Sequence, residues 1–93
     1  MSKRSCESLF EVLLTSKAEK GLKNAPEHMR ASISDIIDSL ENTYFPRGHD
    51  IKKMKGVENT YRIRIGDYRL IYQVDFKDRR IFVLAIGRRK NIY

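Results

Sequence analysis

The sequence YRIRIGDYRLIYQV, residues Tyr61–Val74, decides the fold prediction. Apolar and polar residues alternate on both sides of Gly66-Asp67, and two such runs separated by glycine and a turn-forming residue are typical of a β-hairpin. With a two-residue loop, Ile65 faces Tyr68 and Arg64 faces Arg69. In this register one face of the hairpin carries Tyr61, Ile63, Ile65, Tyr68, Leu70, Tyr72 and Val74, and the other carries Arg62, Arg64 and Arg69.

The second face of this hairpin is cationic. Like charges directly opposite each other across two strands destabilise a sheet, so the pairing of Arg64 with Arg69 indicates that this face binds an anion. A solvated outer face is the structural alternative, because antiparallel sheets often expose one side to water. A solvated face usually mixes charges of both signs, whereas this one holds arginine alone, and we therefore expect an anion site.

The composition predicts one small domain, residues 1–93, with a polyanionic partner. The chain has 93 residues, 41% of them apolar, and a formal net charge of +7. Residues 47–93 hold 13 lysines and arginines against 5 acidic residues, while residues 1–46 hold 6 against 7. The excess charge thus lies in the half that contains the hairpin, which favours nucleic acid, an acidic protein or an anionic membrane surface.

The first eight residues are polar, and we expect them to be flexible. A lone cysteine, Cys6, permits no intramolecular disulfide, which fits a reducing cytoplasm. The sequence has no apolar run of membrane-spanning length, and its start lacks the apolar core of a signal peptide. A cytoplasmic location is therefore expected.

The remaining segments predict two helices and two further strands. Residues 9–14 are apolar with one charge and indicate a strand. Ser16 and Glu19 have capping-box spacing, so a helix is expected from Ser16 to Lys23. A second helix is predicted over Pro26–Glu41, and residues 80–86 form an apolar last strand. The stripe that supports the second helix is Met29, Ile33, Ile36, Ile37 and Leu40.

These elements predict an α+β fold with the order strand-helix-helix-strand-strand-strand. Strands grouped after helices and joined by short loops favour a mostly antiparallel sheet with both helices packed on one face. Residues 42–49 are expected to be a loop. Residues 50–56 look like a segment held by Ile51 and Met54, with Lys52, Lys53 and Lys55 facing outward. The arginine face of the hairpin is then left open to a partner.

No metal site or cofactor is expected. His28 and His49 are far apart in sequence, and neither has a cysteine or histidine at ligand spacing. Glycine-rich phosphate loops are absent, because Gly66 and Gly87 stand alone. Cys6 lies in the polar N-terminal segment and is not expected to be a nucleophile.

A cationic cluster remains as the candidate site. Arginine binds phosphate in a bidentate manner and keeps its charge at any relevant pH. Such a cluster can bind a backbone phosphate or stabilise the charge that develops during phosphoryl transfer. Nearby cations favour the phenolate of a tyrosine, so Tyr93 is a candidate general base or a surface on which a nucleobase stacks. The candidate cluster comprises Arg62, Arg64, Arg69, Arg88 and Arg89, with Lys52, Lys53 and Lys55 at its rim and Tyr93 at its end.

The hairpin, preceded by DIKKMKG and followed by IFVLAIGRRKNIY, resembles the RelE/ParE toxin superfamily, and its RelE branch in particular. The resemblance covers about residues 9–93 and includes the order of the elements. It implies a ribosome-dependent endoribonuclease that cuts messenger RNA in the ribosomal A site, with the 2′-hydroxyl as nucleophile. It also implies a cognate antitoxin with an acidic or amphipathic segment that holds the toxin inactive.

The resemblance also implies roles for individual residues. Arg62, Arg64 and Arg69 would stabilise the phosphate and the transition state. Arg89 would be an acid or a phosphate ligand, and Tyr93 would be the base or a stacking platform. The bacterial type member has lysines where Arg62 and Arg64 stand, and arginine cannot share in proton transfer as a buried lysine can.

Two other functions compete with the endoribonuclease. A ParE-like protein would inhibit a topoisomerase without catalysis and would need no acid–base residues. An inactive relative would bind nucleic acid with a strong salt dependence and would not cleave it.

Overall fold

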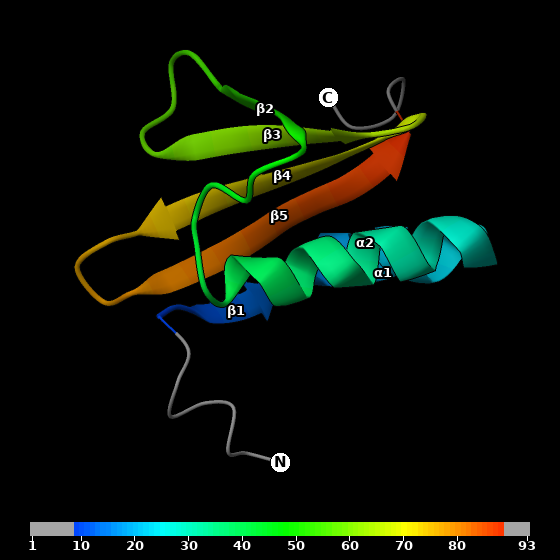
Figure 1. Ribbon diagram of the computed structural model, residues 1–93, viewed down its shortest axis with the longest axis horizontal. Coiled ribbons are helices and arrows are strands. Elements are labelled where there is room, and N and C mark those ends of the chain that lie inside the picture. The colour runs from blue at the N-terminus through cyan, green and yellow to red at the C-terminus, as the bar shows by residue number, and fades with distance from the viewer. Residues whose placement is uncertain (1–8, 89–93) are drawn as a thin grey trace.

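A computed structural model describes residues 9–88 of the chain. Its strands form one five-stranded sheet in the order β1-β5-β4-β3-β2 (Figure 1). β1 is parallel to β5, and the other neighbouring strands are antiparallel. The predicted α+β class is confirmed. The elements are β1 (Glu11–Leu14), α1 (Ser16–Asn24), α2 (Glu27–Leu40), β2 (Asp50–Lys53), β3 (Thr60–Ile65), β4 (Tyr68–Asp75) and β5 (Arg80–Arg88).

The hairpin of β3 and β4 has the predicted register. Arg64 lies opposite Arg69, Ile65 opposite Tyr68 and Tyr61 opposite Tyr72. Gly66 has a φ of 59°, and the first position of a type II′ hairpin loop places glycine in this left-handed region. The two-residue loop therefore fixes which side chains share a face.

β2 is a strand that the sequence did not predict. It pairs with β3 and forms the edge of the sheet, with Asp50 opposite Arg64 and Lys52 opposite Arg62. Three of its four residues are charged, and only Ile51 is partly buried. Short, charged strands are common at sheet edges because they discourage pairing with other chains. The same property leaves almost no apolar alternation for a sequence-based prediction to detect.

Both helices begin close to their predicted positions. The N-cap of α1 is Thr15 rather than the predicted Ser16, since the Thr15 side chain accepts a hydrogen bond of 3.1 Å from the Ala18 amide. Its Oγ1 also donates to the Leu84 carbonyl at 2.9 Å, which ties the start of the helix to β5. Within residues 9–88 neither helix is long and apolar enough to cross a membrane.

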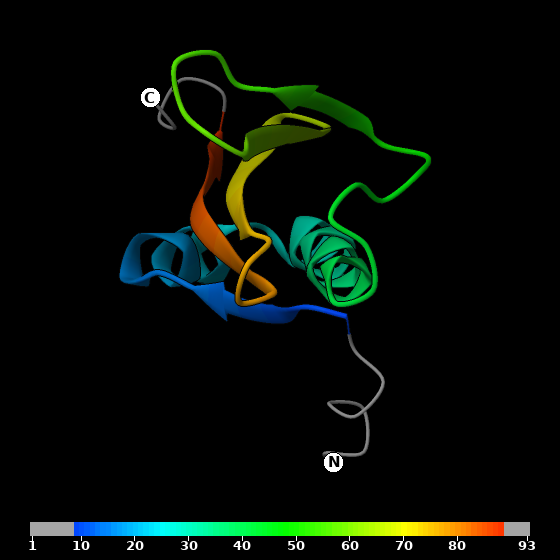
Figure 2. The ribbon, with the colours of Figure 1, turned by 90° about the vertical axis from the view of Figure 1, so that its left-hand side faces the viewer.

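The apolar face of the hairpin forms the core with both helices, as predicted. Ile33 and Leu40 of α2 are fully buried, as are Ile63 and Leu70 of the hairpin. The sheet curves strongly, and α2 lies on its concave side (Figure 2). Within residues 9–88 neither helix covers the opposite face of the sheet, which we call the open face and which carries a small apolar cluster described below.

α1 occupies the place beside β5 where β1 ends. The pairing of β1 with β5 stops at Leu14 and Val83. Beyond this point Gly21 of α1 lies against the backbone of Ile86, so closely that a side chain at position 21 would collide with the Ile86 carbonyl. Glycine is therefore required here by packing, although it is a poor helix former.

Candidate nucleic-acid interface

Two rows of residues cross the open face of the sheet. The first row runs from β2 to β5. The second row lies next to it and is displaced by two residues on each of these strands. The pairings place Asp50, Arg64, Arg69 and Gly87 in the first row, and Lys52, Arg62, Ile71 and Ala85 in the second. The three arginines that the sequence placed on one face are thus brought together.

The cationic ends of these rows line a hollow of about 60 Å³, which we call the arginine hollow. Its lining carries four cations and one carboxylate, a net charge of +3. A small, strongly positive hollow of this kind suits a single anionic group such as a phosphate. The residues that line it are Asp50, Lys52, Arg62, Arg64 and Arg69.

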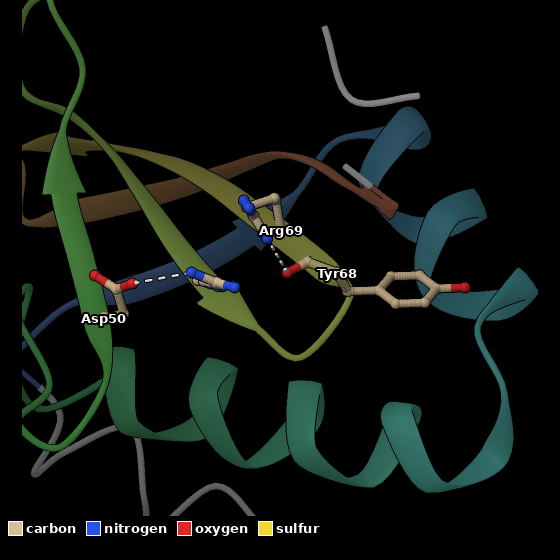
Figure 3. A network of polar contacts seen from close by, with 4 residues as sticks. Asp50, Tyr68 and Arg69 are labelled. Atoms are coloured by element: carbon tan, nitrogen blue, oxygen red, sulfur yellow. Dashed lines mark hydrogen bonds and ion pairs between the residues drawn. The ribbon is translucent and has the colours of Figure 1, made fainter. Parts of the chain in front are cut away.

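Asp50 is the one acidic residue among the described residues that line the arginine hollow, and it was not predicted from the sequence. Its carboxylate lies 4.0 Å from Nη1 of Arg64, and both side chains are more than half exposed (Figure 3). An exposed ion pair at this distance contributes little to stability. Arg69, whose Nη1 donates to the Tyr68 carbonyl at 3.4 Å, points away from the Tyr68 ring (Figure 3). Asp50 therefore reduces the positive charge of the hollow without neutralising it.

A small apolar cluster adjoins the arginines on the same face. Ile71 and Ala85 are buried there, and Met54 and Leu84 pack against them. The register of β4 against β5 shifts at Ile71 and Tyr72, and this irregularity leaves Leu84 as an extra residue on β5. The shift accounts for the apolar residues at successive positions of the last strand. The open face therefore combines a cationic end with an apolar centre.

The predicted rim lysines lie beside this cluster. Lys52 lines the arginine hollow. Lys53 and Lys55 line a second hollow of about 260 Å³, together with Lys52, Met54 and Arg62. The lysines, like the arginines, thus gather where an extended anion would cross the sheet.

Arg88 does not join the arginine hollow. It lies opposite Tyr68 at the end of β5, and successive residues of a strand point to opposite faces. Arg88 lines a separate hollow of about 520 Å³ on the α1 side, with Lys17, Lys20 and Tyr68 among its other residues. This second group of cations was not predicted, because its lysines lie in the half of the sequence without excess charge.

Two further predicted residues, Arg89 and Tyr93, lie outside the described residues. Among the described tyrosines, Tyr61, Tyr68 and Tyr72 all belong to the core on the helix side. Burial raises the pKa of Tyr72, with smaller contributions from Tyr61 and Tyr44, and burial also raises the pKa of Tyr61. These two phenols therefore stay protonated and do not face the arginine hollow, so neither can act as its base.

Within residues 9–88 no three histidine, cysteine or acidic side chains come close enough to hold a metal ion. His28 and His49 are both exposed and lie on different segments. The arginine hollow holds three arginines, which keep their charge at any relevant pH.

The family model of the ParE toxin of the type II toxin–antitoxin system parDE matches residues 12–93. The chain belongs to the RelE/ParE family of toxins. Toxin RelE3 of Methanocaldococcus jannaschii is 40% identical over 86 residues, which cover 90% of this chain and 96% of that protein. Putative toxin RelE1 of the same organism is 34% identical over 85 residues, which cover 90% of this chain and 94% of that protein.

Solved structures of this toxin family agree with the fold. The archaeal RelE–RelB complex from Pyrococcus horikoshii has a TM-score of 0.78 at 31% identity, over 89% of this chain and 98% of that chain. The RelB–RelE antitoxin–toxin complex from Methanococcus jannaschii has a TM-score of 0.73 at 35% identity, over 84% of this chain and 91% of that chain. The isolated E. coli RelE toxin has a TM-score of 0.72 at 20% identity, over 85% of this chain and 83% of that chain. At this identity it supports the fold alone.

Proposed function

We propose that this chain is the toxin of a toxin–antitoxin pair and an endoribonuclease that cuts messenger RNA on the ribosome. The single observation that carries the proposal is the pairing of Arg64 with Arg69 beside Arg62 in one small, open hollow. Like charges directly opposite each other destabilise a sheet, and an anion bound between them would offset the repulsion. The similarity to RelE proteins, at 34% and 40% identity, supports this branch of the family.

In the proposed reaction the 2′-hydroxyl of a ribose attacks the phosphorus of its own 3′-phosphate. The O2′–P bond forms, the P–O5′ bond breaks, and the products are a 2′,3′-cyclic phosphate and a free 5′-hydroxyl. One proton leaves O2′ and one is delivered to O5′. Negative charge accumulates on the non-bridging oxygens in the transition state, and Arg62, Arg64 and Arg69 stabilise it electrostatically.

Arginines at these positions cannot carry out the proton transfers, because a guanidinium does not give up its proton in proteins. We therefore assign the removal of the O2′ proton to Tyr93, which the resemblance gives as base or stacking platform. The resemblance gives Arg89 as acid or phosphate ligand, and because its guanidinium keeps its proton we propose the phosphate ligand, with water delivering the proton to O5′. Lys52, Lys53 and Lys55 bind neighbouring phosphates in this proposal. Arg88 contacts RNA only where the strand passes to the α1 side of the sheet.

The proposed partners are a cognate antitoxin, the ribosome and messenger RNA, with no cofactor and no membrane. Two similar archaeal structures are complexes of RelE with RelB. An acidic or amphipathic antitoxin segment would cover the basic face and fold as it binds. The reaction would take place in the cytoplasm, where ribosomes work.

A second candidate function is inhibition of a topoisomerase without catalysis. The observation that favours it is the matching family model, which describes the ParE toxin. This function needs no transition-state stabilisation and therefore leaves the paired arginines unexplained. Growth arrest with induction of DNA damage and with intact messenger RNA would support it.

Primer extension on messenger RNA after induction of the toxin tests the endoribonuclease directly. We expect new 5′ ends within translated codons for the unaltered protein. Arg69→Ala should abolish them, since removing one such donor typically costs about 10²- to 10³-fold in rate. The matched control is Arg47→Ala, which removes an exposed loop arginine and should leave cleavage unchanged.

Circular dichroism of the purified variants must show that each is folded. Soluble, antitoxin-free protein that produces no new 5′ ends would refute the endoribonuclease. Equal loss of cleavage in Arg69→Ala and Arg47→Ala would show that total charge matters rather than the arginine hollow.

A further inference from the structure

The hollow that contains Met54 adjoins the arginine hollow and shares two of its residues. Lys52 and Arg62 line both. The Met54 hollow has a volume of about 260 Å³ against about 60 Å³ for the arginine hollow. The two hollows therefore differ in size and lie side by side, as the base and the phosphate of a nucleic acid do.

Met54 is the apolar residue among the described residues that line the Met54 hollow, and its backbone is held in place. Met54 is half-buried and packs against the cluster of Ile71 and Ala85. Its amide donates a hydrogen bond of 2.8 Å to the Thr60 carbonyl, which fixes the backbone just after β2. Lysine stems add apolar surface at the sides while their ammonium groups stay in water.

The rim of the Met54 hollow is cationic. Lys52, Lys53, Lys55 and Arg62 line it, and no carboxylate of the described residues does. Cations over the face of an aromatic ring attract it, and a methionine sulfur makes favourable contacts with aromatic rings. One apolar side chain among four cations thus matches a flat aromatic ring that is linked to phosphates.

We infer that the Met54 hollow binds a nucleobase of the single-stranded RNA whose phosphate occupies the arginine hollow. The inference rests on the proposed function and adds a subsite to it. Lys52 and Arg62 contact the phosphate that joins the two positions, and Met54 supports the base. An apolar side chain of an antitoxin is the rival occupant, but it carries no charge to match the four cations that line the hollow.

Fluorescence anisotropy with a short labelled RNA tests the subsite without any need for cleavage. The RNA carries 2′-O-methyl riboses, so that its 2′-oxygens cannot attack, and a matched strand of the same length has abasic riboses. We expect the unaltered protein to bind the strand with bases more tightly. Met54→Ala should weaken binding of that strand by about two- to tenfold, which is the range of methionine–aromatic contacts, and leave binding of the abasic strand unchanged.

Two control variants separate the base from the phosphates. Val57→Ala truncates an exposed apolar residue of the same loop that does not line the hollow, and it should change neither affinity. Lys52→Ala should weaken binding of both strands and lower the slope of log affinity against log salt by about 0.7. Met54→Ala should leave that slope unchanged.

The subsite would be refuted if the unaltered protein bound both strands with equal affinity. It would also be refuted if the protein bound neither strand. It would also be refuted if Met54→Ala weakened both strands alike, or weakened binding of an antitoxin peptide but not of RNA. If base-dependent binding through Met54 were found in a protein that cleaves no messenger RNA, the endoribonuclease proposal would fail and the subsite would stand. Normal cleavage together with a neutral Met54→Ala would refute the subsite alone.

Discussion

Arg64 on β3 lies directly opposite Arg69 on β4, and Arg64 also lies 4.0 Å from the exposed carboxylate of Asp50. Nothing in the folding of the hairpin requires this pair, because the apolar residues on the other face already determine its register. The like charges of this pair lower stability, and in the proposed function a phosphate of the RNA offsets their repulsion. Stability and RNA binding should respond in opposite directions when one of these charges is removed.

Arg64→Gln should raise the free energy of unfolding slightly while it weakens RNA binding. The substitution removes the repulsion from Arg69 and loses only a weak, exposed ion pair with Asp50. We expect a gain of about 0.5 kcal/mol at low salt, within the range of cross-strand charge effects. Urea unfolding at low and high salt measures it, and the gain should shrink at high salt because screening already weakens the repulsion.

Asp50→Asn is the complementary control, since it removes the carboxylate and leaves both arginines. It should lower stability at low salt and strengthen RNA binding. A loss of stability in Arg64→Gln that does not depend on salt would contradict this view of the pair.

Much of this arrangement could be predicted from the sequence. The alternation in residues 61–74 and the loop Gly66-Asp67 were sufficient to pair Arg64 with Arg69, because a two-residue loop leaves a single register. The burial of the apolar face followed from the same alternation. Local pattern was enough wherever the partners are close in sequence.

The residues that the sequence did not predict come to the site through long-range pairing. Asp50 reaches Arg64 only because the short, charged segment at residues 50–53 joins the edge of the sheet. Gly87 reaches Arg69, and Arg88 is turned to the other face, through the pairing of β5 with β4. A charged edge strand has almost no alternation of apolar and polar residues from which it could be predicted. In a strand with a register shift the alternation changes phase, so the face of a residue beyond the shift cannot be predicted from the residues before it.

Gly87→Val should reduce RNA cleavage without destabilising the fold. Gly87 lies opposite Arg69, and a Cβ at this position would meet no other atom within 4 Å. Valine is well suited to a strand, so the free energy of unfolding should stay within about 0.5 kcal/mol of its original value. The new side chain would project over the arginine face and displace the phosphate, which should lower the cleavage rate by about tenfold or more.

Cleavage in a translation reaction, set beside urea unfolding, checks this expectation. Gly87→Ala is the graded control and should have a smaller effect on the rate. Parallel losses of stability and cleavage in the valine variant would show that Gly87 is needed for the fold instead.

Gly21→Ala should destabilise the protein, although alanine normally stabilises a helix by about 0.5–1 kcal/mol relative to glycine. The added methyl group would collide with the backbone carbonyl of Ile86, which cannot move without shifting β5. We expect a loss of about 1–3 kcal/mol, as in other overpacked contacts. Ser34→Ala, at an exposed position of α2, is the matched control and should change stability little; a stabilised Gly21→Ala variant would contradict the close approach of α1 to β5.

Tyr72→Phe should destabilise the protein at neutral pH and do so less at alkaline pH. The Tyr72 hydroxyl donates a hydrogen bond of 2.6 Å to the Tyr44 carbonyl, and its loss should cost about 1 kcal/mol. Burial, followed by the nearby Tyr61 and Tyr44, raises the pKa of Tyr72 in the folded protein. In the unfolded chain a tyrosine ionises near its ordinary pKa of about 10.

Above about pH 10 the unfolded chain therefore releases a proton that the folded protein keeps. The unfolded state then binds fewer protons than the folded state, so the free energy of unfolding falls as the pH rises. Phenylalanine has no proton to release, and the variant escapes this part of the alkaline loss. Urea unfolding of both proteins at about pH 8 and about pH 11 should show a difference that narrows at the higher pH; a constant difference would mean that Tyr72 ionises equally in both states.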